Sequence, residues 1–571
     1  MAQDSLRSRR NNARSAPHRA YRPDTLRCAD RRAFRMSSES RSPEAAATSS
    51  PALDRNMIER VCAGDILIRS AQRYAQRPAI IDGDRVISYR QLDDRANRLG
   101  QALLALGLTS QDVVAVMARN IPELLITYFA CAKAGLICAP LNLALNGEDI
   151  TYCLSDSRAR VLIVDSALVT AAQALPAQLP DLRHVYWIGS DAHMEVAKSA
   201  GTFDALVASG TIEELQVPVH DRDAVQLLYT SGTTASPKGV LTSHLAVTIT
   251  ALSTALVQKF TPESNLLCIL PLFHCAQLNA ATLPALMTGA CVVLTQGFDA
   301  GKVGELIEQH RISMVFMLPM MYGALLAEPS TAKRDFSCVT RAMYAMAPMS
   351  QERLEAVHAL LPHADVVLGS GQTEFTPPTC FQLPEQQWDK AASWGVATPM
   401  TRIAIMDDDG NLLPPGETGE IVYRGPQVMN GYLNLPAPTA ESFRHGWFHS
   451  GDIAWMDEEG VVWFCDRKKD MIKTGGENVA SIEVERCLLA HPDVVDAAVV
   501  GVPHEHWGEA VVAAVVLVAD ALADEAALIE HCRQRLSSFK VPKTVHVLPE
   551  FPRTGTGKIQ KHILREKLHK P

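Results

Sequence analysis

One stretch decides the fold: residues 227–240 read LLYTSGTTASPKGV. An apolar run that includes Val225 and Leu227 leads into a segment of small hydroxyl residues and glycines, which closes on Lys238. This order predicts a strand, an anion-holding loop, and a second strand or helix. Glycines let the backbone approach a phosphate closely, hydroxyls and N–H groups donate hydrogen bonds to it, and a lysine adds positive charge. The stretch is therefore typical of a polyphosphate-binding loop.

This stretch differs from the P-loop of kinases and GTPases. That loop needs a lysine followed at once by Ser or Thr, whereas Gly239 and Val240 follow Lys238 here. A solvent-exposed turn rich in Ser, Thr and Gly is an alternative, and composition alone favours it. The choice between the two depends on residues far downstream.

The composition limits what the chain is. Its 571 residues exceed what one hydrophobic core supports, so we expect two or more domains. A hydrophobic content of 47% with 20% charged residues is typical of a globular protein, and the net charge of −9 argues against a nucleic-acid partner. No apolar run is long enough for a transmembrane segment. The 13 cysteines lack regular spacing, which indicates core residues in a reducing compartment; we expect a cytoplasmic location.

Residues 1–56 differ from the rest. Eleven arginines and few acids lie between Ser5 and Arg41, which predicts a disordered basic leader. Such a composition is also that of a mitochondrial transit peptide, which would imply a mitochondrial location. Because the segment lacks amphipathic spacing, we favour a basic tail without an address, or a start of the chain at Met36 or Met57.

After Met57 helical and strand patterns alternate. Helices are predicted at residues 66–74, 88–106 and 121–134, and strands at 113–117, 161–164, 225–229, 266–270, 291–294, 314–318 and 364–368. Strands alternating with helices predict parallel β-α units, which bind ligands at the carboxyl ends of their strands.

The pattern changes farther along. Short strands at residues 403–406, 419–423 and 461–464, separated by glycine turns, predict an antiparallel region. Beyond Asp466, helices at 481–490 and 524–536 and strands at 494–502 and 510–518 predict a small α+β unit. We therefore expect a domain boundary near Lys469.

Three later glycine loops carry groups that suit a nucleotide. Residues 369–374 (GSGQTE) follow a strand, and a carboxylate there suits the Mg²⁺ that accompanies a nucleotide. Residues 446–452 (GWFHSGD) end on Asp452, which suits two ribose hydroxyls, and residues 552–559 (PRTGTGKI) present Lys558. Taken singly, each loop is explained as well by an exposed turn or a flexible basic tail.

Together with residues 466–470 (DRKKD) and 475–478 (GGEN), these loops resemble the adenylate-forming superfamily of acyl- and aryl-CoA synthetases, adenylation domains and beetle luciferases. The resemblance covers residues 57–567, with at least five motifs in order. It implies an α/β fold with a large N-terminal domain of two α/β subdomains plus a small β-barrel, and a small mobile α+β C-terminal domain. The implied divisions are a leader at 1–56, an AMP-binding N-terminal domain at 57–468 and a swivelling C-terminal domain at 469–571.

The resemblance also implies the chemistry. A carboxylic acid would be joined to AMP with release of pyrophosphate and then passed to a thiol, with ATP, Mg²⁺ and coenzyme A as cofactors. Both steps need charge stabilisation more than acid–base catalysis. The residues that would hold the nucleotide are Thr230, Ser231, Gly232, Thr233, Thr234, Lys238, Gly371, Gln372, Thr373, Asp452, Arg467 and Lys558.

Four of the implied residues would be catalytic. Glu374 and Thr230 would bind Mg²⁺, and Lys558 would bridge the attacking carboxylate and the α-phosphate. His274 would lie beside the acyl carboxylate, although a lone histidine after a strand is otherwise a core or helix-cap residue. After adenylation the C-terminal domain would rotate about Lys469 and bring the coenzyme A loop to the thiol entrance, namely Gly475, Gly476 and Glu477.

Two positions depart from the family pattern. Ser370 stands where the family has an aromatic residue against adenine, and the adenine loop reads AMAP at residues 345–348, with Met346 in place of glycine. We still expect ATP, because the phosphate and ribose motifs are intact.

The sequence thus predicts an ATP-dependent carboxylic acid:CoA ligase, an AMP-forming acid-thiol ligase. Small and apolar residues at 275–287 and 375–381 suit an apolar tail, which favours a medium- or long-chain fatty acid over an aryl acid such as a cinnamate. An acyl-AMP ligase that loads a carrier protein is a further alternative, against which the hinge and the glycine loop at 475–477 count. A non-catalytic ligand-binding relative is disfavoured by Lys558 and Glu374.

Overall fold

The structure is a computed structural model that describes residues 50–173, 175, 179–189, 198–230, 237–345, 349–519, 521–553 and 559–569. The chain divides into residues 1–49 and residues 50–571, and every described helix and strand belongs to the second unit. Most of the predicted leader lies outside the described residues. Its end overlaps helix α1 (Pro51–Glu59), which Ser50 caps. Asn56 exchanges two hydrogen bonds with the backbone of Val219, so this part of the predicted leader belongs to the folded unit.

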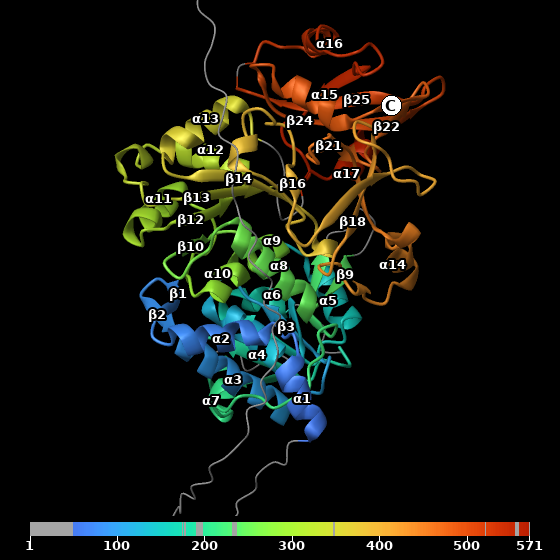
Figure 1. Cartoon of the computed structure of the whole chain (residues 1–571). Coiled ribbons are helices and arrows are strands. Elements are labelled where there is room, and N and C mark those ends of the chain that lie inside the picture. The colour runs from blue at the N-terminus through green and yellow to red at the C-terminus, as the bar shows by residue number, and fades with distance from the viewer. Residues whose placement is uncertain are drawn as a thin grey trace, which may run out of the picture. The chain divides into compact units, whose positions relative to one another are not determined.

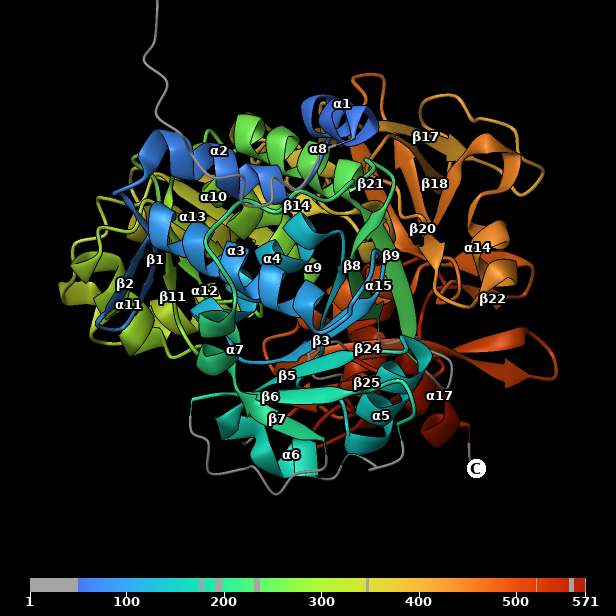
Figure 2. The same cartoon turned by 90° about the horizontal axis from the view of Figure 1, so that it is seen from below.

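An eight-stranded sheet contains both flanks of the glycine-rich stretch. Its strand order is β19-β9-β8-β4-β3-β5-β6-β7. The bounds are β3 (Val113–Met117), β4 (Ile137–Pro140), β5 (Val161–Asp165), β6 (His184–Ile188), β7 (Ser199–Thr202), β8 (Ala224–Thr230), β9 (Lys238–Ser243) and β19 (Gly431–Tyr432). Strands β3 and β5 are fully buried and run parallel, as expected for β-α units covered on both faces. Helices α3 (Tyr89–Ala105) and α4 (Pro122–Ala134) lie on one side of β3, β5 and β6 and helix α5 (Gly147–Asp156) on the other (Figure 2).

A nine-stranded sheet forms the second layer, in the order β16-β15-β14-β13-β12-β10-β11-β1-β2. The bounds are β1 (Pro78–Asp82), β2 (Arg85–Ser88), β10 (Asn265–Cys268), β11 (Cys291–Leu294), β12 (Met314–Met317), β13 (Arg341–Ala345), β14 (Asp365–Ser370), β15 (Cys380–Gln382) and β16 (Val396–Ala397). Strand side chains alternate between two cores. One core includes α2 (Gly64–Tyr74), α8 (His244–Val257) and α10 (Leu283–Thr288). The other includes α11 (Ala300–Gln309), α12 (Pro319–Ala327) and α13 (Gln351–Leu360), which Figure 1 shows beside β12 and β13.

The predicted antiparallel region is a four-stranded sheet in the order β17-β18-β20-β21. Its strands are β17 (Arg402–Met406), β18 (Gly419–Arg424), β20 (Phe448–Met456) and β21 (Val462–Arg467). The last part of the chain forms a five-stranded sheet and three α-helices. The strands are β22 (Ile472–Thr474), β23 (Glu477–Val479), β24 (Val494–His504), β25 (Gly508–Leu517) and β26 (Thr544–Val547), and the helices are α15 (Ser481–Leu489), α16 (Glu525–Arg533) and α17 (Lys561–Leu568). The predicted α/β class, with a large N-terminal and a smaller C-terminal domain, is confirmed.

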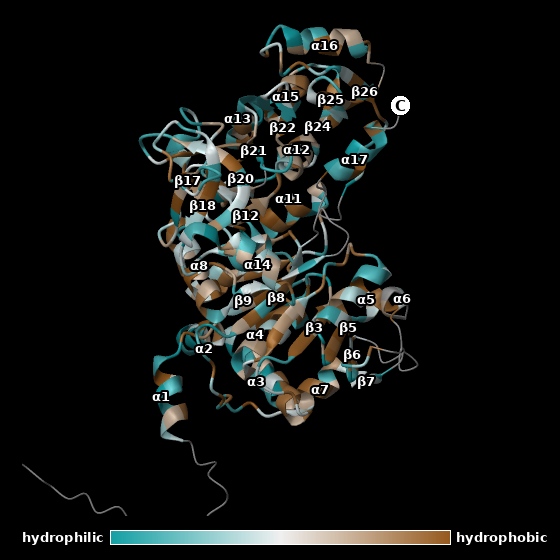
Figure 3. Cartoon of the chain, turned by 90° about the vertical axis from the view of Figure 1, so that its right-hand side faces the viewer, coloured by the Kyte–Doolittle hydropathy of each residue, from teal (hydrophilic) through white to brown (hydrophobic). Residues whose placement is uncertain are grey.

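Hydrophobic residues predominate in the strands and many helices combine hydrophilic with hydrophobic residues, as the brown strands and partly teal helices of Figure 3 show. Twelve cysteines lie in the described residues without a disulfide, and all except Cys338 and Cys465 are buried, which confirms their predicted place in the core. Within the described ranges no helix is long and apolar enough to cross a membrane.

Candidate functional site

The glycine-rich stretch connects two paired strands. Thr230 ends β8 and Lys238 begins β9, and the two residues face each other in an antiparallel ladder. The Thr230 hydroxyl donates weakly to the Lys238 carbonyl at 3.4 Å. The element that follows the loop is therefore a second strand and not a helix. Residues 231–236, which include the predicted Ser231, Gly232, Thr233 and Thr234, lie outside the described residues.

A tyrosine that the sequence pattern did not single out connects this hairpin to the predicted Mg²⁺ ligand. Tyr432 belongs to β19, which pairs with β9 so that Tyr432 faces Val240. The Tyr432 hydroxyl donates to Glu374 Oε1 at 3.0 Å, while Lys238 Nζ lies 5.1 Å from the centre of its ring. Burial, and then the charge of Glu374, raise the pKa of Tyr432, so its hydroxyl stays protonated and keeps donating. Tyr432 thus contacts both Glu374 and Lys238 and holds the two side chains near each other.

The residues predicted for the α-phosphate and the acyl carboxylate are also adjacent. Thr373 begins a short 3₁₀ helix (Thr373–Phe375) after β14. Its hydroxyl lies 3.2 Å from the sulfur of Cys275, which in turn lies 3.8 Å from His274 Nδ1. His274 caps the helical stretch that begins with α9 (Cys275–Gln277), because Nδ1 accepts from the backbone of Ala276 at 3.2 Å. His274 is therefore a helix cap, as one of the two roles weighed from the sequence expects, and Cys275 connects it to Thr373. Its place beside the acyl carboxylate stays a prediction.

The predicted ribose pair is present as a cross-strand ion pair. Asp452 on β20 and Arg467 on β21 are register partners, and Arg467 Nε lies 2.8 Å from Asp452 Oδ1. Asp452 is buried, and its charge is among the causes that raise the pKa of Cys380, after burial itself. Cys380 faces Ser370 in the β14–β15 ladder, so Asp452 lies close to the loop that holds Gly371, where the φ angle is +159°.

The predicted hinge and coenzyme A loop lie in turns. Lys469 is exposed in the turn after β21. Gly475 and Gly476 connect β22 to β23 with φ angles of +59° and +87°, values that favour glycine, and Glu477 is exposed. Trp507, which no motif singled out, accepts a backbone hydrogen bond from Gly475 at 2.8 Å.

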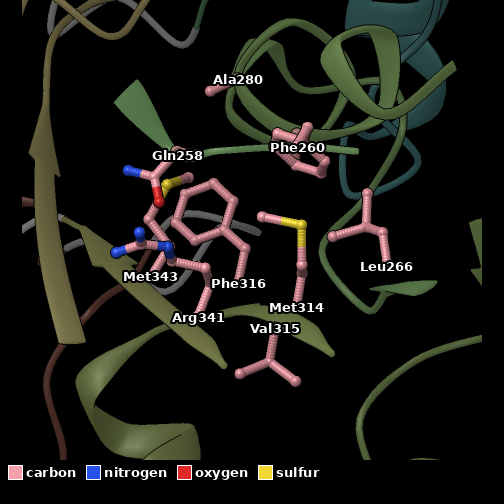
Figure 4. Close-up of a pocket in the computed structure, with 10 residues that line it drawn as sticks. Gln258, Phe260, Leu266, Ala280, Met314, Val315, Phe316, Arg341 and Met343 are labelled. Atoms are coloured by element: carbon pink, nitrogen blue, oxygen red, sulfur yellow. The ribbon is translucent and has the colours of Figure 1, made fainter. Parts of the chain in front are cut away.

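A cavity lies between the nine-stranded sheet and the helical stretch that follows His274 (Figure 4). Two of the small residues predicted to line the acyl site, Ala280 and Ala281, contribute to its wall. Both precede α10 in a π-helical turn (Leu278–Thr282), an irregularity that is common at functional sites. The other lining residues are Gln258, Phe260, Leu266, Met314, Val315, Phe316, Arg341 and Met343.

Lys558, the adenine loop and Gln372 complete the set of predicted positions. Lys558, in the glycine loop at residues 554–558, and the adenine-loop residues Met346, Ala347 and Pro348 lie outside the described residues. Gln372 is half-buried, and its Nε2 atom is enclosed without a hydrogen-bond partner in the described structure, which suits a residue that faces a polar ligand.

The site fits Mg²⁺ bound together with phosphates. Glu374 offers a half-buried carboxylate whose orientation Tyr432 fixes, and Thr230 offers a hydroxyl. The described ranges contain no cluster of three or more His, Cys, Asp or Glu side chains. Mg²⁺ is commonly held by one or two carboxylates plus substrate phosphates, so a single carboxylate beside a phosphate loop is sufficient.

Comparison with known proteins defines the class. Residues 67–433 match the family described as AMP-binding enzyme, and residues 483–558 match the AMP-binding enzyme C-terminal domain. The chain therefore belongs to the AMP-binding enzyme family, which confirms the predicted adenylate-forming superfamily and the predicted acid-thiol ligase class.

Individual relatives cover almost the whole folded unit. The chain is 35% identical to an indoleacetate–CoA ligase of Aromatoleum aromaticum over 86% of this chain and 95% of the relative. It is 34% identical to the long-chain-fatty-acid–CoA ligase FadD13 of Mycobacterium tuberculosis over 84% and 93%. The crystal structure of ATP-bound MatB from Rhodopseudomonas palustris matches with a TM-score of 0.81, 30% identity, and coverage of 89% of this chain and 99% of that one.

Proposed function

We propose that the chain joins a carboxylic acid to coenzyme A by way of an acyl-AMP intermediate, with a medium- or long-chain fatty acid as substrate. The observation that carries the proposal is the contact of Tyr432 with both Glu374 and Lys238. It brings the loop after β14 and the hairpin of the other sheet together, as a ligand with several phosphates and a metal ion requires.

Each predicted site residue has its own role in the proposed reaction. Lys238 steadies the β- and γ-phosphates, Thr373 donates to the α-phosphate, and the buried Asp452 accepts from the ribose hydroxyls while Arg467 orients it. Mg²⁺, when bound at Glu374, offsets phosphate charge. Lys558 neutralises the attacking carboxylate and the α-phosphate together, and the predicted rotation about Lys469 then exchanges it for Gly475, Gly476 and Glu477 at the entrance for the thiol.

An aryl-acid CoA ligase is the second candidate. The indoleacetate–CoA ligase relative supports it, as FadD13 supports the fatty acid. The small and apolar residues at 275–287 and 375–381 suit either a chain or a ring. Loading of a carrier protein is the third candidate.

Pyrophosphate release with ATP, Mg²⁺ and a panel of acids tests the enzyme, and mass spectrometry of the CoA products from competing aliphatic and aryl acids tests the substrate. We expect aliphatic acyl-CoA products to dominate. No pyrophosphate release with any acid would reject the ligase. Release without acyl-CoA, with product only after a carrier protein is added, would favour the carrier-loading alternative.

A further inference from the structure

We propose that Glu420 is a positioning residue of the ribose site, because it holds both the irregular part of β20 that carries Asp452 and the end of β21 that carries Arg467. This inference rests on the proposed function and specifies how the nucleotide site selects the ribose hydroxyls. Glu420 acts through Asp452 and not by a contact of its own with the nucleotide.

Strand β20 is irregular where it carries the ribose residue. In its ladder with β18, Ile453 faces Glu420 and His449 faces Val422. The three residues between Ile453 and His449, which end on Asp452, lie opposite a single residue of β18. Figure 2 shows β18, β20 and β21 side by side. A bulge of this kind leaves backbone groups unpaired and changes the direction of a side chain, and bulges are common next to active sites.

Glu420 pairs one of the backbone groups in this bulge. It is 6% exposed, and its Oε1 accepts from the backbone N–H of Gly451 at 3.0 Å, one residue before Asp452. Ser450 pairs another group, since its hydroxyl accepts from the backbone N–H of Asp452 at 3.0 Å and donates to the Ile421 carbonyl on β18 at 2.6 Å. The two side chains therefore connect the backbone on both sides of Gly451 to β18.

The other oxygen of Glu420 connects the same bulge to β21. Oε2 accepts from Lys468 Nζ at 3.1 Å, and the backbone N–H of Lys468 donates to the carbonyl of Gly451 at 2.9 Å. Glu420, Gly451 and Lys468 thus form a closed ring of three hydrogen bonds. Gly451 precedes Asp452 and Lys468 follows Arg467, so one carboxylate holds the neighbours of both members of the ribose ion pair.

The surroundings of Glu420 keep its carboxylate charged. Burial alone would raise the pKa of Glu420, but hydrogen bonds from His449, Gly451 and Lys468 outweigh burial and lower this pKa. The contact with His449 joins Nδ1 to Oε2 at 3.1 Å. A charged acceptor binds N–H groups about twice as strongly as a neutral one. Loss of the charge would therefore weaken all of these bonds at once and let the bulge move.

The test measures how well the site distinguishes ATP from 2′,3′-dideoxy-ATP, which lacks both hydroxyls that Asp452 accepts from in the proposed site. The readout is the ratio of kcat/KM for the two nucleotides in pyrophosphate exchange, with the binding of both also measured by calorimetry. Because a hydrogen bond to a charged group contributes about tenfold or more, we expect the natural chain to prefer ATP by about 100-fold.

Glu420→Gln keeps the size of the side chain and removes its charge. Its amide N–H group would face either the ammonium of Lys468 or the backbone N–H of Gly451, which are donors themselves, so the ring cannot close. We expect the preference for ATP to fall by about tenfold. The preference is a ratio within one preparation, so partial loss of folded protein does not change it.

Two further variants separate positioning from stability. Asp457→Asn is the matched control, because Asp457 also accepts from a lysine, Lys390 at 2.7 Å, and from a backbone N–H, that of Val461 at 2.9 Å, at the far end of the β20–β21 hairpin. It should leave the preference unchanged. Asp452→Ala should remove most of the preference, and Glu420→Gln added to it should change the preference no further, since a positioning residue acts only through the residue it positions.

The outcomes separate this inference from the proposed function. If no acid supports pyrophosphate exchange, the proposed ligase is refuted, and the calorimetric preference for ATP still decides whether Glu420 positions Asp452. Lys468→Met opens the ring but leaves Gly451 bound to Glu420, so a smaller loss of preference is expected, about threefold. Four results would overturn the inference: no preference in the natural chain, a preference that survives Glu420→Gln, an equal loss in Asp457→Asn, or a further loss when Glu420→Gln is added to Asp452→Ala.

Discussion

Tyr432→Phe isolates the contact on which the proposed nucleotide site depends. The change keeps the ring beside Lys238 and removes only the 3.0 Å hydrogen bond to Glu374. A hydrogen bond to a charged group contributes about 1.5–3 kcal/mol, which corresponds to a loss of about 10- to 100-fold in kcat/KM for Mg-ATP. Tyr432→Leu also removes the contact with Lys238, for a further loss of about 0.5–2 kcal/mol.

The assay is the first half-reaction alone, measured as exchange of pyrophosphate into ATP, with KM for Mg-ATP and kcat determined separately. Tyr229→Phe is the matched control, because Tyr229 also donates to a carboxylate, Asp156 Oδ2, at 2.9 Å. Both variants should lower the free energy of unfolding by a similar amount, but only Tyr432→Phe should weaken exchange. Equal loss of exchange in both variants would refute the role of Tyr432 in positioning Glu374.

Three further predictions concern a buried histidine, the coenzyme A loop and the predicted catalytic lysine. Burial lowers the pKa of His244 from 6.5 to about 3, so between these pH values the unfolded chain binds a proton that the folded chain does not. As the pH is lowered from 6.5 towards 3, the free energy of unfolding should therefore fall by about 1.4 kcal/mol per pH unit. Urea unfolding of His244→Asn should lack this dependence. In Gly475→Ala the added carbon would lie 3.1 Å from the Trp507 ring, whereas in Gly476→Ala it meets nothing within 4 Å. Both glycines have positive φ, so the backbone strain is common to the two variants and the contact with Trp507 is the difference. We therefore expect a higher KM for coenzyme A in Gly475→Ala than in Gly476→Ala, with pyrophosphate exchange unchanged. Lys558→Ala should abolish exchange and leave thioester formation from supplied acyl-AMP largely intact, and equal losses in both would contradict the domain rotation.

The order of motifs and many of the elements could be predicted from the sequence, because each depends on residues close together in the chain. The strand at residues 225–229 appears as β8, and the helix at 121–134 as α4. Several strands escaped prediction, β4 and β13 among them. β4 reads ICAP and ends on a proline, which is depleted in strands, and β13 begins with Arg341, a charged residue that is rare in a buried strand.

The contacts that complete the site could not be predicted in this way. Tyr432 contacts Glu374 only because β19 pairs with β9, about 190 residues away in sequence, and Gln258 and Arg341 line one cavity only because a helix end packs against the sheet. In each case the side chain is ordinary for its local pattern, and its partner depends on the order of strands within the sheets. A tyrosine after a glycine and a glutamine at a helix end carry no signal of their own.

The predicted rotation about Lys469 must act against a buried network that crosses the turn. Asp466 Oδ2 on β21 accepts from both the backbone and the hydroxyl of Ser481, the latter at 2.6 Å. Lys561 on α17 donates to the same hydroxyl at 2.6 Å and lies 2.7 Å from Glu485, whose pKa burial raises despite this cation. Because Asp466 precedes Lys469 and Ser481 follows it, the network stabilises one orientation of the C-terminal part over any other.

Ser481→Ala removes the hydroxyl at the centre of this network and should change the rates of adenylation and of thioester formation from supplied acyl-AMP in opposite directions. The loss of one or two hydrogen bonds predicts a change of about tenfold in their ratio. Lys540→Met, which breaks the 2.7 Å ion pair with Glu483 on the same helix α15, is the control and should alter stability alone. If Ser481→Ala lowered stability while both half-reactions kept their rates, the network would have to move as one body with β21, and the pivot would lie elsewhere than at Lys469.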